Sequence, residues 1–138
     1  MRLIGILFLV VIMTTSCNSN KETIKNRTKN EETLLGTFYI SQLGDNYSFS
    51  EKLSITFEDS TNNVSGFAGC NRFFGTYNLN EKQIRFENIA STKKFCQQDV
   101  NNLENEFLKV LNSTNTISIH DSIFSFLDGE TVLMKAKK

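Results

Sequence analysis

The feature that most constrains the fold is a series of short segments in which apolar and polar residues alternate. Leu53, Ile55 and Phe57, for example, are separated by single polar residues. A period of two places the apolar side chains on one face of a β-strand. About eight such segments are expected to be strands, and turn-forming residues such as Asp128-Gly129 separate them. They cover residues 36–43, 53–58, 63–69, 72–79, 84–87, 117–120, 123–127 and 131–136.

One later segment has a different period. Between Val100 and Leu111 the apolar residues recur every three to four positions, which predicts an amphipathic helix of about three turns. Asp99 precedes this segment and is the expected N-cap. A helix inserted between hairpin strands leaves a gap in the strand order. We therefore expect an α+β fold, a small, mostly antiparallel, strongly curled sheet or incomplete β-barrel with the helix plugging one opening.

The beginning of the chain has the composition of a targeting signal. Arg2 precedes an uncharged apolar run over residues 3–13, which is shorter than the roughly 20 residues that span a bilayer. Cys17 follows small polar residues and resembles the lipidated cysteine of bacterial lipoproteins, although Thr14 stands where that pattern prefers leucine. We expect residues 1–16 to be a cleaved lipoprotein signal peptide and Cys17 to carry the lipid. A plain signal peptide with an incidental cysteine is the alternative.

Residues 17–33 are expected to form the lipidated cysteine and a flexible tether. The segment 18–33 contains one large apolar residue, Ile24, so it cannot bury enough surface to offset its ordering entropy. Residues 34–138 are expected to form one folded domain. Two or more acyl chains give firm membrane attachment without a spanning helix. Asn18 after the cysteine favours sorting to the outer membrane of the bacterial cell envelope.

The charged residues limit the classes of partner and of chemistry. The chain has 15 basic and 15 acidic side chains, and this balance argues against a nucleic-acid partner. Two small basic groups, Lys93-Lys94 and the terminal group Lys135, Lys137 and Lys138, are expected to be solvated, with contact to anionic lipid as the alternative. His120 is the only histidine, and one histidine makes neither a zinc site nor a triad. We therefore expect no metal and no cofactor.

A glycine-rich run and two later segments resemble a known family when they are taken together. The run reads Val64-Ser65-Gly66-Phe67-Ala68-Gly69-Cys70-Asn71-Arg72-Phe73-Phe74-Gly75-Thr76-Tyr77, and the later segments are Ile89–Cys96 and Leu103–Leu111. In this order they resemble the META domain, the HslJ-like family of envelope proteins, over about 100 residues. The resemblance implies a small α+β, barrel-like fold and an association with heat shock, envelope stress or virulence, without an established reaction. Phe38 is a departure, because many members place tryptophan there.

The residues that match the family signature are expected to be mainly structural. They are Gly66, Gly69, Asn71, Arg72, Gly75, Thr92 and Glu104. Three glycines in a strand-like run predict bulges or sharp bends. An asparagine at such a bend usually bonds to the local backbone, and Glu104 is expected to bond to the backbone of the barrel. Arg72 could instead present its guanidinium to a carboxylate.

Cys70 and Cys96 remain as a pair once Cys17 is lipidated. In an oxidising compartment an even pair predicts a disulfide. Two buried thiols that act as small apolar side chains are the alternative. A redox catalyst is less favoured, because the chain has no Cys-x-x-Cys pair and no histidine beside either cysteine.

The expected function is that of a non-catalytic envelope lipoprotein. It would be attached to the membrane through Cys17 and would bind a protein partner or support envelope integrity under stress. Two alternatives remain open. One is a carrier that holds an acyl chain or another apolar ligand in the barrel, and the other is a thiol-dependent enzyme.

Overall fold

The structure, a computed structural model, describes residues 34–58 and 60–138. The predicted signal peptide, the lipidated Cys17 and the tether lie outside the described residues. The elements are β1 (Gly36–Leu43), β2 (Ser54–Phe57), β3 (Asn63–Phe67), β4 (Arg72–Asn80), β5 (Gln83–Ser91), α1 (Gln98–Ser113), β6 (Thr116–His120), β7 (Ile123–Asp128) and β8 (Thr131–Lys137).

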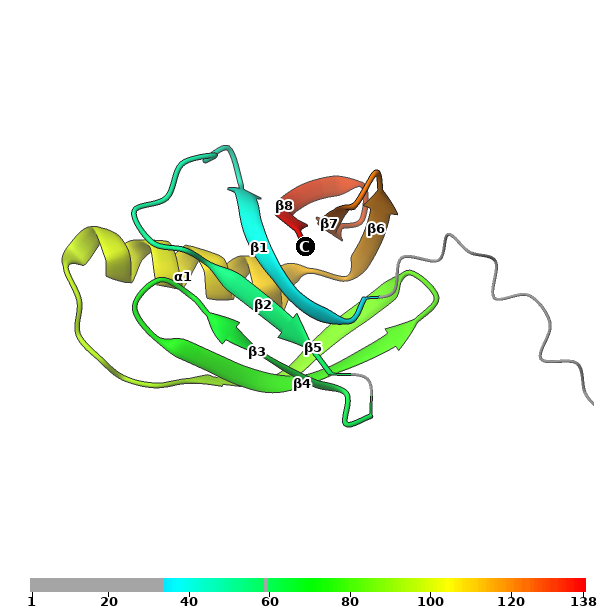
Figure 1. The fold of residues 1–138 in the computed structure, drawn as a ribbon, viewed down its shortest axis with the longest axis horizontal. Helices are drawn as coiled ribbons and strands as arrows, with labels where there is room; N and C mark the ends of the chain where they lie inside the picture. The colour runs from blue at the N-terminus through cyan, green and yellow to red at the C-terminus, as the bar shows by residue number, and fades with distance from the viewer. Residues whose placement is uncertain (1–33, 59) are drawn as a thin grey trace, which may run out of the picture. The chain divides into compact units, whose positions relative to one another are not determined.

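The described strands form one strongly curled antiparallel sheet (Figure 1). Each strand pairs with the next along the chain, and β8 returns to pair with β1. The junction between β5 and β6 is narrow, since a single position, Gln83 opposite Thr116, is paired there. The chain inserts α1 at this junction. The predicted α+β fold, a curled, mostly antiparallel sheet with one late helix, is therefore confirmed, and its ring of strands is irregular rather than evenly paired.

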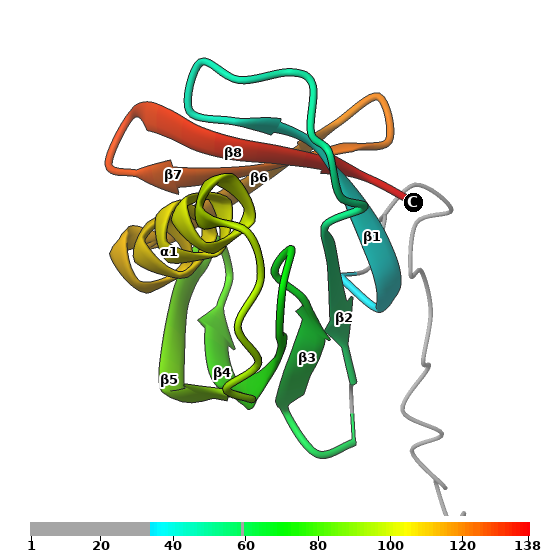
Figure 2. The same cartoon turned by 90° about the vertical axis from the view of Figure 1, so that its left-hand side faces the viewer.

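The helix fills the side of the sheet where the pairing is weakest. Figure 2 shows α1 between β7 and β5, and both strands contact it. Phe107 and Leu111 are fully buried and belong to the same core as the strands. The amphipathic period of three to four residues thus places one face of the helix against the interior.

The predicted start of this helix was wrong by two positions. The N-cap is Gln97, which makes no side-chain capping bond, and Asp99 lies inside the first turn. Its Oδ1 accepts a hydrogen bond from the backbone N–H of Val100 at 2.9 Å. A carboxylate is favourable anywhere in the first turn, because it interacts with the positive end of the helix dipole. The sequence alone therefore does not distinguish these two positions.

Aromatic rings fill the interior of the curled sheet. Phe38, Phe73, Phe107 and Phe126 are among the largest fully buried side chains. The ring centroid of Phe38 lies 4.2 Å from that of Phe124. The core is therefore close-packed where side chains of β1 and β7 meet in the interior.

Restoring the tryptophan found in many family members at position 38 is expected to destabilise this protein. The ring of Phe38 is fully buried, and a larger side chain forces its neighbours to move, which costs about 1–3 kcal/mol. Urea denaturation of Phe38→Trp measures the change in the free energy of unfolding. Tyr47→Trp, at a position that is 69% exposed, is the matched control. An unchanged stability of Phe38→Trp would show that the core has spare volume.

The glycines of the signature allow close approach between strands. Gly66 pairs with Ile55 and Phe73, and a Cβ added to it would lie 2.0 Å from the carbonyl oxygen of Ser54. Gly75 faces a bulge in β5, where the register against β4 shifts. The bend predicted at Gly75 therefore coincides with a bulge, whereas Gly66 lies in regular pairing with both neighbouring strands.

Two predicted strands were wrong by more than one residue at an end. The strand expected over 63–69 ends at Phe67, because Gly69 has a φ of +117° and lies in the loop before β4. The strand expected over 84–87 is longer and continues to Ser91. It passes through the bulge at Asn88, whose φ of +55° interrupts the alternation of apolar and polar residues.

Candidate functional site

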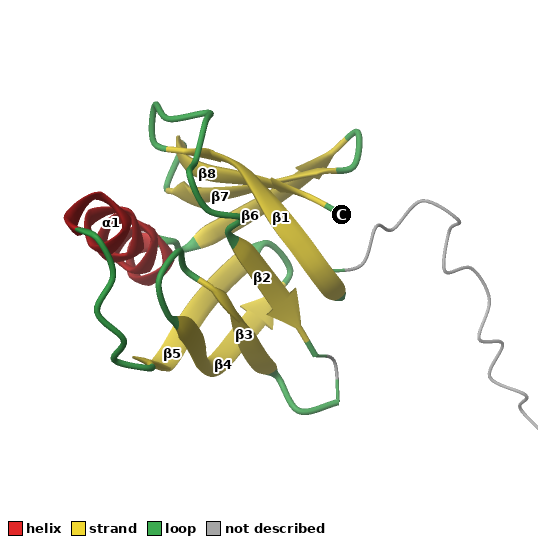
Figure 3. Ribbon diagram, turned by 60° about the vertical axis from the view of Figure 1, so that its left-hand side comes forward, coloured by secondary structure: helices red, strands yellow, loops and turns green. Residues whose placement is uncertain are grey.

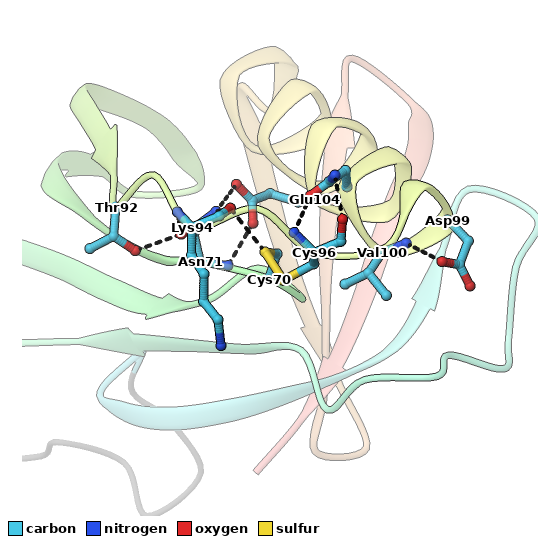
Figure 4. The surroundings of a disulfide bond; sticks show 9 residues. Cys70, Asn71, Thr92, Lys94, Cys96, Asp99, Val100 and Glu104 are labelled. Atoms are coloured by element: carbon cyan, nitrogen blue, oxygen red, sulfur yellow. Dashed lines mark hydrogen bonds between the residues drawn. A yellow bond between two sulfur atoms is a disulfide. The ribbon is translucent and has the colours of Figure 1, made fainter.

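Asn71 is the centre of a buried polar network between β4, the loop after β5 and α1 (Figure 4). Its Nδ2 donates to the carbonyl oxygen of Lys94 at 3.1 Å and to Oε1 of Glu104 at 3.1 Å. Its Oδ1 accepts hydrogen bonds from the backbone N–H of Lys94 at 2.7 Å and from the hydroxyl of Thr92 at 2.8 Å. The asparagine side chain thus fixes the loop after β5, which is the role that such residues have at bends.

The helix contributes one carboxylate to this network. Glu104 is buried, and its Oε2 accepts the backbone N–H of Asn71 at 2.6 Å. Glu106, two positions later, is exposed, because residues i and i+2 point to different sides of a helix. A buried carboxylate requires hydrogen-bond donors, and Asn71 supplies two of them. Glu104 therefore holds α1 against the start of β4.

A disulfide ties the same loop to the start of β4. Cys70 and Cys96 are bonded, with their Cα atoms 5.9 Å apart. The Sγ of Cys70 lies 3.2 Å from the carbonyl oxygen of Lys94. The backbone of Cys96 is fixed from its other side, because Asn101 accepts its N–H and donates to its carbonyl oxygen. The loop over residues 92–97 is therefore held at both of its ends.

Phe95 lies between these two fixed positions and points to solvent. Its side chain is 94% exposed, more than the other large exposed hydrophobic residues of the described chain. Lys94 before it is held by Asn71, and Cys96 after it is held by the disulfide. We define residues 92–97 as the Phe95 loop. Phe95 was not among the residues predicted to be functional. Its sequence signal was that it is an apolar residue outside any strand or helix period.

The other candidate residues lie apart from this network. Arg72 is exposed, and among the described residues it makes no ion pair. His120 is the last residue of β6. Its side chain is 88% exposed, and its Nδ1 lies 2.9 Å from the carboxylate of Asp121. Within residues 34–58 and 60–138, no group of three or more histidine, cysteine or acidic side chains could hold a metal. The hydrogen bonds of the network go mainly to backbone groups, so the network positions the backbone of the loop after β5.

A groove of about 300 Å³ lies beside the β4–β5 hairpin. Polar side chains make up most of its lining: Asn78, Asn80, Gln83, Arg85, Glu87 and Asn115, with Ile84. Sites for small apolar ligands are lined predominantly by hydrophobic and aromatic side chains. This groove therefore does not have the lining that a carrier of acyl chains requires.

In the part of the chain that the structure describes, no helix is long and apolar enough to span a membrane. The helix α1 has 16 residues and is amphipathic, and about 20 predominantly apolar residues are needed to cross the hydrocarbon core.

Comparison with known proteins identifies a family and a shared fold. The family model described as META domain matches residues 32–138. An NMR structure of a protein has a TM-score of 0.61 at 18% identity, over 78% of this chain and 92% of that chain. No curated protein matches the chain.

Two further solved structures have the same fold. An NMR structure of a protein from Burkholderia xenovorans has a TM-score of 0.59 at 17% identity, over 74% of this chain and 80% of that chain. A crystal structure of a DUF4847 family protein from Bacteroides vulgatus ATCC 8482 has a TM-score of 0.56 at 15% identity, over 78% of this chain and 94% of that chain. At these identities the likeness shows the fold alone.

Proposed function

The chain belongs to the META domain family, and from that premise we propose that it is a non-catalytic envelope lipoprotein whose domain binds a protein partner through the Phe95 loop. The observation that carries the proposal is the position of Phe95, which is 94% exposed between two fixed neighbours. The lipid anchor at Cys17 and the tether that follows it are the part of the proposal that rests on the sequence. They would keep the domain at the surface of a bacterial membrane, and Asn18 after Cys17 favours the outer membrane of the envelope.

The exposure of Phe95 has a measurable physical cost. Burying a phenylalanine side chain is worth about 1.5–3 kcal/mol relative to leaving it in water. Single exposed apolar residues are common on protein surfaces, so exposure alone does not indicate a binding site. Phe95 differs in that Asn71 and the disulfide fix the backbone on both sides of it. An aromatic side chain on a preorganised loop loses little conformational entropy on binding and is typical of interface hot spots.

The two alternatives have less support. The interior that a carrier would need is filled by buried phenylalanine rings such as Phe38, Phe73 and Phe126. The cysteines that a thiol-dependent enzyme would use are joined in a disulfide. No specific observation on the described residues favours either alternative, so we propose no second function.

Photocrosslinking in intact cells tests the proposal at a single residue. A photoreactive phenylalanine analogue at position 95 is expected to give a discrete adduct with one envelope protein, because the ring of Phe95 would insert into the partner. The same analogue at position 47, where Tyr47 is 69% exposed, is the matched control and is expected to give no such adduct. Immunoblotting of the irradiated cells measures the adducts.

A competition experiment separates a specific partner from random collision. Excess unlabelled protein with Phe95 present is expected to reduce the adduct several-fold, whereas excess Phe95→Ser protein is expected to leave it unchanged. Equal adducts from positions 95 and 47, or equal competition by both unlabelled proteins, would contradict the proposal.

A further inference from the structure

A second surface feature is a group of basic side chains around an exposed tyrosine on the outer side of the sheet. Tyr39 of β1 is 42% exposed, and its neighbour across the strand pair is Lys137 of β8. The Nζ of Lys52 lies 4.0 Å from the centroid of the Tyr39 ring. The ammonium group of Lys52 therefore makes a cation–π contact with this amphipathic ring, and a second lysine stands across the strand pair from Tyr39.

Lys135 extends this group along β8. It is two residues before Lys137 and therefore points to the same outer face. Its cross-strand neighbours are Gln42 and Ser125, and those of Lys137 are Tyr39 and Ile123. No acidic side chain stands opposite either lysine, and among the described residues neither makes an ion pair. We define Tyr39, Lys52, Lys135 and Lys137 as the basic face.

The basic face lies close to the point where the chain enters the domain. β1 begins at Gly36, and the Cε of Lys138 lies 3.6 Å from where a Cβ on Gly36 would be. β8 runs beside β1 to this end, whereas the Phe95 loop, between β5 and α1, lies at the other end of the domain (Figure 3). The chain as a whole has equal numbers of basic and acidic residues, so this unpaired positive charge is a local feature.

We propose that the basic face binds the surface of a membrane that contains anionic phospholipid. The lysine ammonium groups contact lipid phosphates, and Tyr39 places its ring at the level of the headgroups, where amphipathic aromatic side chains are enriched. The binding does not depend on a lipid at Cys17. Where Cys17 is lipidated, the basic face acts with the acyl chains and turns the Phe95 loop away from the membrane.

Vesicle binding of the chain over residues 17–138 with Cys17→Ser tests this proposal. The compact unit over residues 32–138 closes its own ring of strands and contains its whole core, so this chain is expected to fold. It is expected to bind vesicles of phosphatidylcholine with phosphatidylglycerol and not vesicles of phosphatidylcholine alone. Each lysine near an anionic surface contributes about fivefold to binding. The variant Lys52→Gln/Lys135→Gln/Lys137→Gln is therefore expected to bind roughly 100-fold more weakly.

A second triple variant controls for net charge. Lys82→Gln/Arg85→Gln/Lys109→Gln removes the same charge from exposed positions outside both the basic face and the Phe95 loop and is expected to retain binding within about twofold. High salt is expected to release the protein that retains the three lysines of the basic face from the vesicles, because salt screens the attraction between exposed charges. Equal loss in both triple variants, or binding that does not require phosphatidylglycerol, would overturn the proposal. Crosslinking from position 95 tests the protein-binding site, and its result does not depend on whether the basic face binds vesicles.

Discussion

Asn71→Ala is expected to lower the free energy of unfolding by about 4 kcal/mol, since four side-chain hydrogen bonds of about 1 kcal/mol each are lost. Those bonds join Asn71 to Lys94, Thr92 and Glu104 in a buried setting. The substitution also leaves the carboxylate of Glu104 with one donor fewer. Urea denaturation followed by circular dichroism gives the change, provided that the slope with denaturant stays constant.

Two further substitutions show whether the effect belongs to the network. Asn71→Asp keeps the shape but removes both Nδ2 donors and places a second carboxyl group beside Glu104, so it is expected to destabilise at least as much as Asn71→Ala. Asn78→Ala, at an exposed position of β4, the strand that follows Asn71, is expected to change stability by less than about 0.5 kcal/mol. A similar small change for Asn71→Ala would show that the network contributes little.

A double-mutant cycle between Asn71→Ala and Glu104→Ala would measure the coupling directly. The two side chains share a hydrogen bond of 3.1 Å, so their effects are expected to be non-additive by about 0.5–3 kcal/mol. Additive effects would mean that each residue acts through other contacts.

Removing the disulfide is expected to have the second-largest effect. The bonded cysteines are 26 positions apart, and the chain-entropy relation for a loop of that length gives about 3.5 kcal/mol. The double variant Cys70→Ala/Cys96→Ala is therefore expected to unfold at a lower urea concentration. For a domain of this size the midpoint of thermal unfolding is expected to fall by roughly 15–25 °C.

The third cysteine provides a matched control for this experiment. Cys17→Ser lies outside the compact unit over residues 32–138 and is expected to leave the stability of the domain unchanged. Thiol counting on the denatured, unlipidated protein should find one free thiol, and three free thiols would rule out the bond. If the disulfide also positions Phe95, the double variant should give a weaker crosslink from position 95 even at temperatures where it is folded.

Much of the fold could be predicted from the alternation of apolar and polar residues. The strand expected over 36–43 is β1, and the hairpin turns at 121–122 and 129–130 lie where turn-forming residues occur. Errors arose where the backbone departs from a regular strand. Gly69 adopts a positive φ in a loop, and Asn88 does so in a bulge within β5. A bulge shifts the side-chain alternation by one residue, so a pattern of period two does not extend through it.

The signature residues could be identified from the sequence, but their contacts could not. Glu104 and Asn71 are 33 positions apart, and their hydrogen bonds exist only because α1 returns to the start of β4. Asn101, which fixes the backbone of Cys96, had no sequence signal, since asparagines are common in this chain.

The sequence by itself determined the family, the class of fold and the residues that form the core, because these depend on local periodicity and on which side chains avoid water. The tertiary structure decided which polar residues meet and which apolar residue stays in solvent. Phe95 is the clearest example: its residue type suggests burial, yet it is 94% exposed. The constraints that Asn71 and the disulfide impose on its two neighbours hold it there, and such contacts between distant segments form only in the folded chain.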